Sequence, residues 1–169
     1  MKIVILDRAT LGFGVDMSIF DSLGEVISYD ITLENETISR VKDADIIIVN
    51  KVSMNEETLK EASRVKLICV TATGVDNIDF QYTNKRGIVV TNVKNYCTAA
   101  VAQHTFAMAL YLIEHIRHYD DYVKSGIYAN QPRFSNFDLP FYELEGKTWG
   151  IFGMGNIGQN VAKIAQAFG

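Results

Sequence analysis

Five short apolar runs, rich in Val and Ile, recur along the first part of the chain and constrain its fold more than any other feature. They cover residues 3–6, 26–29, 46–49, 67–71 and 88–91. None alternates polar with apolar side chains, which is typical of strands covered on both faces, as in a parallel sheet. Segments of helix length separate the runs, and we expect helices over residues 17–23, 35–41, 56–63 and 80–85. This alternation predicts a doubly wound α/β fold.

Local signals continue this pattern toward the end of the chain. Ser53-Met54-Asn55-Glu56 resembles a capping box that would open the third helix. Residues 99–118 predict one long helix that is apolar on most sides, and such a helix is buried between layers or across a subunit contact. Residues 128–142 are aromatic-rich and aperiodic, which indicates a loop. We then expect a strand over residues 147–152 and a helix over residues 156–168.

A GxGxxG motif, Gly153-Met154-Gly155-Asn156-Ile157-Gly158, lies between that strand and that helix. This is the context that a dinucleotide-binding fingerprint requires. Gly153 would permit the tight turn, Gly155 would let the backbone approach a pyrophosphate, and Gly158 would let helix and strand pack closely. Free N–H groups at the helix start would hold the phosphates. The alternative is a glycine turn in a domain that binds nothing.

The fingerprint also predicts a ribose-binding carboxylate about 20 residues further on, which is beyond Gly169. One strand and one helix cannot bury their own apolar faces. We therefore expect the fold to continue past Gly169. The alternative is a short chain that is partly disordered after Gly146.

Composition and charge exclude several classes of partner. The net charge of −4 offers no basic face for nucleic acid or an anionic membrane. No apolar run reaches the length of about 18 residues that a membrane span needs, and the first residues lack a signal-peptide pattern. Cys69 and Cys97 have neither CxxC spacing nor a disulfide-rich context, so we expect free thiols and a cytoplasmic protein.

Candidate binding residues follow two neighbouring apolar runs. In an open α/β sheet, ligands bind at the carboxyl ends of the strands. Asn50-Lys51 ends one run and Thr73-Gly74-Val75 follows the next, so both can reach one cleft. Backbone N–H groups around Gly74 could form an anion-binding nest, with Lys51 as a cation beside the anion. The alternatives are a tight turn capped by Asp76 or Asn77 and a lysine at a solvated strand end.

Other reactive side chains have weaker support. His104 is expected to be a hydrogen-bonded helix residue rather than a general acid. His115 and His118 share a helix face, but no further ligand stands at suitable spacing, so we expect no metal site. Cys97 as a nucleophile would need a matched histidine and oxyanion donors, which the sequence does not indicate.

Taken in order, these motifs resemble the D-isomer-specific 2-hydroxyacid dehydrogenases over essentially the whole chain. The segments that carry the resemblance are Ala72-Thr73-Gly74-Val75-Asp76-Asn77-Ile78-Asp79, Gly87-Ile88-Val89-Val90-Thr91-Asn92-Val93, Tyr96-Cys97-Thr98, Val101-Ala102-Gln103-His104-Thr105 and residues 146–169. Together with Asn50-Lys51, they are most similar to the hydroxypyruvate reductase, or glycerate dehydrogenase, branch. Many relatives have a glutamate where this chain has Gln103, and this difference fits the branch. Many also have a proline where this chain has Lys94, and this difference puts nothing catalytic in doubt.

The resemblance implies a flavodoxin-like substrate domain over residues 1–98. A linking helix and the first βα unit of an incomplete Rossmann NAD(P)-binding domain would follow over residues 99–169. It also implies a homodimer with the long helix 99–118 near the subunit contact. The implied cofactor is NAD or NADP. The implied substrate-binding residues are Lys51, Thr73, Gly74 and Val75. The implied cofactor-binding residues are Thr73, Val101, Gly153, Gly155, Asn156, Ile157 and Gly158.

The function implied is reduction of a small 2-keto acid, resembling hydroxypyruvate or glyoxylate, to the D-2-hydroxy acid. The family's catalytic arginine, glutamate and histidine would lie beyond Gly169, so we expect no catalytic residue in this chain and no activity from it alone. An alternative is a dinucleotide-sensing, corepressor-like module of the same family. A third reading, a receiver-type domain, would use Asp7 at a metal site, but Arg8 and Lys51 oppose cation binding there.

Overall fold

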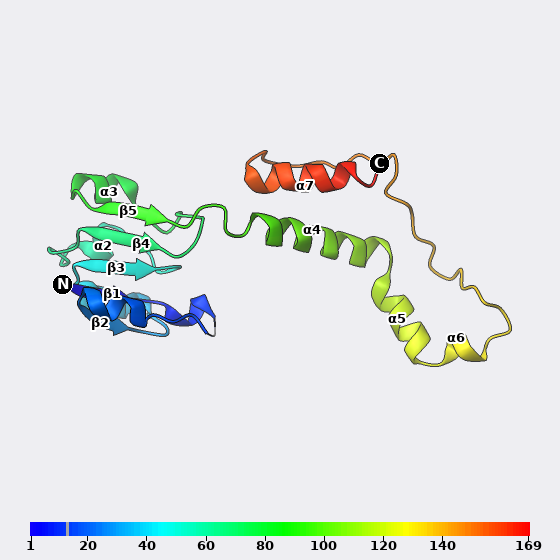
Figure 1. The fold of residues 1–169 in the computed structure, drawn as a ribbon, viewed down its shortest axis with the longest axis horizontal. Helices are drawn as coiled ribbons and strands as arrows, with labels where there is room; N and C mark the ends of the chain where they lie inside the picture. Colours follow the sequence, from blue (N-terminus) through cyan, green and yellow to red (C-terminus); the bar gives the residue numbers. More distant parts are fainter. Residues whose placement is uncertain (13) are drawn as a thin grey trace. The chain divides into compact units, whose positions relative to one another are not determined.

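Five parallel strands form the centre of the first of two units, Met1–Lys94 and Asn95–Gly169, into which the chain divides. The structure is a computed structural model that describes residues 1–12 and 14–169. The sheet has the order β2-β1-β3-β4-β5, and Figure 1 shows its arrows pointing the same way. The strands are β1 (Lys2–Ile5), β2 (Glu25–Ser28), β3 (Ile46–Val49), β4 (Leu67–Val70) and β5 (Val89–Asn92). This is the flavodoxin-like order, and the predicted fold class is confirmed.

Short helices connect the strands, and apolar clusters lie on both faces of the sheet. On one face Val4, Ile47 and Ile68 are fully buried within the larger cluster. On the other, Ile3, Ile5 and Ile48 form a second cluster. Because neighbouring side chains of a strand point to opposite faces, burial on both explains why these runs do not alternate. The helices are η1 (Arg8–Leu11), η2 (Ser18–Leu23), α1 (Glu34–Val41), α2 (Glu56–Leu59) and α3 (Phe80–Lys85).

Local expectations for this unit were met in part. The helix expected over residues 17–23 is present as the 3-10 helix η2 (Ser18–Leu23), and the helix expected over residues 56–63 is shorter, the single turn α2 (Glu56–Leu59). The capping residue of α2 is Asn55 rather than Ser53. The Asn55 side chain accepts the N–H of Thr58 at 3.0 Å, and the Thr58 hydroxyl accepts the N–H of Asn55 at 3.0 Å. The capping box therefore begins two residues later, at Asn55, whose extended backbone immediately precedes the first residue of α2.

The second unit is largely helical, and the single helix expected over residues 99–118 is interrupted. Its helices are α4 (Thr98–Ile113), α5 (Ile116–Lys124), α6 (Ile127–Asn130) and α7 (Asn156–Gln166). His115 adopts a left-handed conformation with φ 50°, which separates α4 from α5. A left-handed residue cannot continue a right-handed helix, and the apolar pattern alone does not reveal such a break.

The expected strand over residues 147–152 is absent, although the helix that follows it is present as α7. A strand requires a hydrogen-bonded neighbour. All the strand pairs among residues 1–12 and 14–169 belong to the sheet of the first unit. The segment still packs through its side chains, because Trp149 and Ile151 contact the core of the second unit.

Packing of α7 against α4 forms that core (Figure 1). Its buried residues are Ala102, Phe106 and Val161. The ring of Phe106 stacks on Trp149 with centroids 4.6 Å apart and on Phe168 at 5.6 Å. Stacked rings of this kind contribute beyond the apolar area they bury, so Phe106 anchors to α4 the residues that precede and follow the glycine turn and α7.

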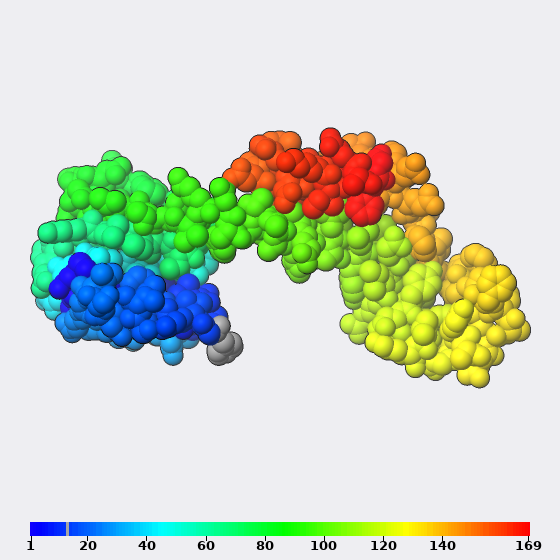
Figure 2. Space-filling view, in the orientation of Figure 1, coloured from blue at the N-terminus to red at the C-terminus, as the bar shows by residue number. Residues whose placement is uncertain are grey.

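Much of the apolar surface of α4, α5 and α6 is exposed. In Figure 2 the segment around α5 and α6, in yellow-green and yellow, forms a lobe of the second unit. Exposed apolar side chains along these helices are Val101, Met108, Tyr111, Leu112, Ile116, Val123, Ile127 and Tyr128. Within residues 1–12 and 14–169, no helix combines the length and apolar character needed to cross a membrane.

Candidate functional site

The carboxyl edge of the parallel sheet brings the loops after β1, β3, β4 and β5 together. Val49 pairs with Val70 and Val70 with Asn92, so these strands end at the same level. The predicted binding residues follow directly: Lys51 after β3, and Thr73, Gly74 and Val75 after β4. The structure therefore places Lys51 and the Gly74 loop on neighbouring strand ends, as sheet geometry predicts.

The loop after β3 is tied to the end of β1 by a buried carboxylate. Asp7 is only 6% exposed. The N–H of Asn50 donates to its two oxygens at 2.9 and 3.0 Å, and the N–H of Lys51 donates at 2.6 Å. Hydrogen bonds to an ionised acceptor are stronger than neutral ones, so these bonds hold the backbone of Asn50-Lys51 firmly.

The loops after β3 and β4 are joined to each other. The side-chain amide of Asn77 donates to the carbonyl of Val52 at 3.0 Å. Next to it, Met54 N–H donates to the Asn77 carbonyl at 2.8 Å, and Met54 forms an isolated parallel bridge with Ile78. Neither Asn77 nor Asp76 caps the next helix. Asp79 caps α3 by accepting the N–H of Tyr82 at 2.9 Å. The proposed capping role of Asp76 or Asn77 was therefore wrong.

The Gly74 loop is also bound to the end of β5. The hydroxyl of Thr73 donates to the Val93 carbonyl at 2.9 Å, and the side-chain amide of Asn92 donates to the Thr73 carbonyl at 2.7 Å. Val93 N–H donates to the carbonyl of Ala72 at 3.1 Å. These bonds fix the backbone on both sides of Thr73, which is the requirement for a preorganised anion site.

The side chains of the Gly74 loop differ in what they can offer a ligand. Thr73 and Gly74 are exposed, whereas Val75 packs against the main core. A Cβ at Gly74 would lie 3.1 Å from the carboxylate of Asp76, which is closer than ordinary contact. Val75 can therefore contribute its backbone N–H but not its side chain, and Gly74 leaves room where a side chain would crowd the loop.

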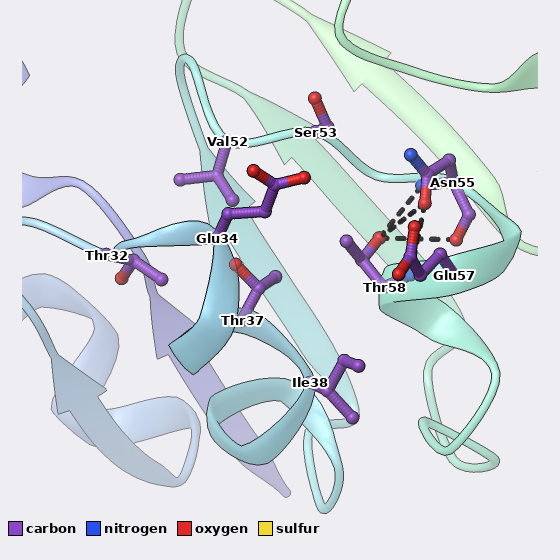
Figure 3. Close-up of a pocket in the computed structure, with 9 residues that line it drawn as sticks. All are labelled: Thr32, Glu34, Thr37, Ile38, Val52, Ser53, Asn55, Glu57 and Thr58. Carbon is purple, nitrogen blue, oxygen red and sulfur yellow. Dashed lines mark hydrogen bonds between the residues drawn. The ribbon is translucent and has the colours of Figure 1, made fainter.

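Two cavities adjoin this edge and share Thr32 and Val52. One, of about 240 Å³, contains Lys51. The other, of about 260 Å³, lies between α1 and α2, with Glu34 and Glu57 on its walls (Figure 3). The second cavity has carboxylates on both walls and no cation among the described residues that line it, which makes it a poor match for an anion. The first also contains two carboxylates, Asp7 and Asp30, but it has Lys51 beside them. The residues lining the first are Asp7, Thr10, Asp30, Ile31, Thr32, Lys51 and Val52.

The glycine turn of the second unit has the geometry that each glycine of a dinucleotide fingerprint requires. Gly153 has φ 96°, a conformation that favours glycine. A Cβ at Gly158 would lie 2.1 Å from the Gly153 carbonyl oxygen, so only glycine fits there. A Cβ at Gly155 would have no neighbour within 4 Å, which leaves open space in front of the backbone. The turn is therefore closed on its inner side and accessible at its middle glycine.

The start of α7 can hold an anion. Gly155 is the N-cap and has no side chain to accept the first helical N–H groups. Asn156 donates its side-chain amide to Asn95, so its side chain is used within the unit. The side chain of Ile157 packs into the core. The turn therefore offers peptide nitrogens at the positive end of a helix, which is the chemistry that binds a diphosphate.

The remaining candidates lie on α4 or immediately before it. Val101 lies on α4 and is 39% exposed, while His104 is an exposed residue of the same helix. Cys97 immediately precedes α4. Among residues 1–12 and 14–169, no three metal-binding side chains are grouped to hold a metal ion. Asp7, Asn77 and Asn92 are the side chains that sequence reasoning missed as parts of the site. For Asp7 and Asn92 the available signal was their position at or just after a strand end, whereas Asn77 lies further into the loop after β4 and carries no such signal.

A family model described as D-isomer specific 2-hydroxyacid dehydrogenase, catalytic domain, matches residues 4–166. A hydroxypyruvate reductase of Blautia hydrogenotrophica is 39% identical, with 100% of this chain and 54% of that protein covered. A glycerate dehydrogenase of Methylorubrum extorquens is 36% identical, with 99% and 53% covered. The chain thus spans about half the length of these curated relatives.

Solved structures agree with these sequence matches. An acyclic imino acid reductase in complex with NADPH and D-Arg matches with a TM-score of 0.82 and 30% identity, covering 99% of this chain and 53% of that one. A D-lactate dehydrogenase of Aquifex aeolicus, complexed with NAD and lactic acid, matches with a TM-score of 0.78 and 29% identity, covering 99% and 49%. Both neighbours hold a nicotinamide dinucleotide.

Proposed function

The chain belongs to the D-isomer specific 2-hydroxyacid dehydrogenase family, and from this premise we propose that the whole protein reduces a small 2-keto acid with NADH or NADPH. The product is the D-2-hydroxy acid, and hydroxypyruvate and glyoxylate are the proposed substrates. The observation that carries this proposal is the Gly74 loop, held by hydrogen bonds on both sides next to Lys51.

In this proposal, the carboxylate of the substrate binds at the Gly74 loop. The backbone N–H groups of Gly74 and Val75 donate to its oxygens, and Lys51 provides the nearby positive charge. None of the ion pairs among residues 1–12 and 14–169 involves Lys51. Its ammonium group is therefore available for a substrate anion, and a 2-keto acid bound through its carboxylate is held in one orientation.

The proposed dinucleotide site is the turn from Gly153 to Gly158. The open space in front of Gly155 fits a diphosphate. Asn156, Ile157 and Gly158 form the first turn of α7, where N–H groups have no intrahelical acceptor and can donate to a ligand. Thr73 and Val101 are further proposed cofactor contacts. The bound dinucleotide supplies the hydride, while the residues of this chain bind and orient. The polarising cation and the proton donor of the family are expected outside this chain.

The exposed apolar face of α4 and α5 supports a further part of the proposal, a homodimer through residues 99–118. Exposed apolar patches of this kind mark protein contacts. Leu112, at 70% exposure, is a suitable probe, and Leu33 of the first unit, at 59%, is a matched control. In the full-length protein, Leu112→Glu is expected to shift the mass measured by light scattering toward the monomer, and Leu33→Glu is not. A monomeric wild-type protein would refute the dimer.

Steady-state kinetics of the full-length protein test the main proposal. Hydroxypyruvate, glyoxylate and larger 2-keto acids would each be assayed with NADH and with NADPH. Gly74→Val is expected to raise the KM for the keto acid about tenfold or more, because the loss of one charged hydrogen bond is enough for that change. The dissociation constant for the dinucleotide should stay within about twofold. Dinucleotide binding without turnover of any 2-keto acid would instead favour a sensing module.

A further inference from the structure

The buried carboxylate of Asp7 does not contact the substrate in the proposal above. It nevertheless accepts the backbone N–H of Lys51, the residue that provides the positive charge for the substrate. We propose that Asp7 is a positioning residue, which holds the backbone of Asn50-Lys51 so that Lys51 is presented to the substrate anion. This inference rests on the proposed function, because it assigns to Asp7 an effect that acts through Lys51.

The geometry shows how one carboxylate can define this loop. Two consecutive N–H groups, of Asn50 and Lys51, converge on Asp7, and the shortest bond, 2.6 Å, belongs to Lys51. Consecutive amides that point to one acceptor restrict the backbone dihedrals between them. The side chain of Lys51 therefore leaves the sheet in a direction set by Asp7 rather than by the strand alone.

A second set of hydrogen bonds holds the backbone around Asp7 in place, so that its carboxylate has a fixed origin. The Asn50 side-chain amide donates to the hydroxyl of Thr10 at 2.9 Å, and that hydroxyl donates to the Asp7 carbonyl at 2.7 Å. On the other side, Arg8 N–H donates to the carbonyl of Tyr29 at 2.9 Å. Asp7 is thus anchored both to the loop that it holds and to the end of β2.

Charge supports a positioning role over neutralisation of the lysine. Asp7 and Lys51 line the same cavity of about 240 Å³. No carboxylate among residues 1–12 and 14–169 lies within the 4.0 Å ion-pair distance of Lys51. The Asp7 oxygens instead accept peptide N–H groups, so its charge is directed to the backbone and the lysine stays available for an anion.

Asp45 provides a matched control within the same sheet. Its carboxylate also accepts a backbone N–H, that of Lys2, at 2.7 Å, and pairs with Arg64 at 2.8 Å. Lys2 begins β1 and Asp45 immediately precedes β3, so these bonds lie at the amino edge, opposite to the proposed site. Asp45→Asn therefore removes the negative charge from a comparable carboxylate–amide contact without touching the loop that carries Lys51.

A double-mutant cycle in the full-length protein tests the inference. The variants are Asp7→Asn, Lys51→Met and their combination, with Asp45→Asn as the control. We expect Asp7→Asn to raise the KM for the keto acid at least about fivefold, with kcat and the dinucleotide dissociation constant changed less than about twofold. In the Lys51→Met background the same substitution should add less than about twofold, because residues that act through one another are not additive. Asp45→Asn should leave KM unchanged.

Each other outcome has a definite meaning. If Lys51→Met raises KM but Asp7→Asn does not, or raises it equally in both backgrounds, Asp7 is only structural and the inference fails alone. If Lys51→Met leaves KM unchanged, the role proposed for Lys51 fails and the inference fails with it. Should Asp7→Asn not fold, Thr10→Val replaces it. This substitution removes the bond from Asn50, and it should raise KM in the same non-additive way.

Amide hydrogen exchange gives a readout that does not depend on turnover. Asp7→Asn should accelerate exchange of the Asn50 and Lys51 amides by about tenfold or more, the change expected when a charged hydrogen bond is lost. Exchange in β4 should change much less. Unchanged exchange at both amides would overturn the positioning role even if KM had risen.

Discussion

The glycine turn allows a prediction in which two similar substitutions have opposite consequences. Gly158→Ala adds a methyl group 2.1 Å from the carbonyl oxygen of Gly153, a backbone atom that cannot rotate away. Gly155→Ala adds the same methyl group where nothing lies within 4 Å. The first change should therefore damage folding of the turn, and the second should damage only what binds in front of it.

Magnitudes follow from these contacts. Overpacking of this kind destabilises by about 1–3 kcal/mol, so Gly158→Ala should lower the free energy of unfolding by at least that amount. At Gly155 the backbone, with φ −73° and ψ −169°, is one that alanine adopts without strain. Alanine is a poorer N-cap than glycine, which lowers the free energy of unfolding by about 0.5–1 kcal/mol. It also restricts the unfolded chain, which raises that free energy by about 0.4–1 kcal/mol, so the net change in stability is near zero. The methyl group would nevertheless keep a diphosphate from the backbone, and the loss of one charged hydrogen bond weakens binding about tenfold.

Urea unfolding and calorimetric titration with NADH and NADPH, both on the full-length protein, measure the two effects. Gly155→Ala should unfold with the wild-type midpoint and bind at least about tenfold more weakly. Gly158→Ala should unfold at a lower urea concentration. Wild-type affinity in Gly155→Ala would refute the assignment of this turn to the diphosphate. Wild-type stability in Gly158→Ala would show that the turn relaxes more easily than its geometry indicates.

Three further predictions concern the two units separately. Asp45 accepts the backbone N–H of Lys2, which lowers the pKa of its carboxyl group from 3.8. It therefore stabilises the folded state above that pH, and Asp45→Asn should reduce the loss of stability on acidification below pH 4, measured by urea unfolding. Asn92→Ala, which removes the bond to the Thr73 carbonyl, should raise the KM for the keto acid several-fold without changing dinucleotide affinity in titrations. Phe106→Ala should lower stability by about 3–5 kcal/mol, because it empties a buried stack, and should shift the emission of Trp149, the only tryptophan.

Each of these predictions can fail separately. An identical acid dependence in Asp45→Asn would show that the ionised carboxylate of Asp45, with its contacts to Lys2 and Arg64, contributes nothing to acid stability. Unchanged KM in Asn92→Ala would mean that the remaining bonds, from the Thr73 hydroxyl and the Val93 amide, are sufficient to hold the loop. Unchanged tryptophan emission in Phe106→Ala would contradict the stacking of Phe106 on Trp149.

Patterns of side-chain type in the sequence predict much of this fold because they report burial directly. The apolar runs around Ile47 and Ile68 are strands because both faces of the sheet are covered, which also explains their lack of alternation. The conformational roles of Gly153 and Gly158 can also be predicted from the sequence. One requires a positive φ, and the other approaches a backbone atom too closely for any side chain.

Features that depend on a neighbouring segment or on the conformation of a single residue were harder to predict. Residues 147–152 have the composition of a strand, yet they form none, because a strand is defined by a neighbour and no strand of the described residues lies beside them. The long apolar helix is interrupted at His115 by a single left-handed residue, and the apolar pattern continues across that break.

For the proposed binding edge, the sequence alone determined which residues follow the strand ends, Lys51 and the loop around Gly74, because chain order and parallel pairing are sufficient for that. Only the tertiary structure revealed what holds them. Asp7, Asn77 and Asn92 reach across 43, 25 and 19 positions of the chain to accept from or donate to another loop. The physical reason is that a hydrogen bond depends on distance in space, and no local pattern of residues encodes a distance between loops that the fold itself brings together.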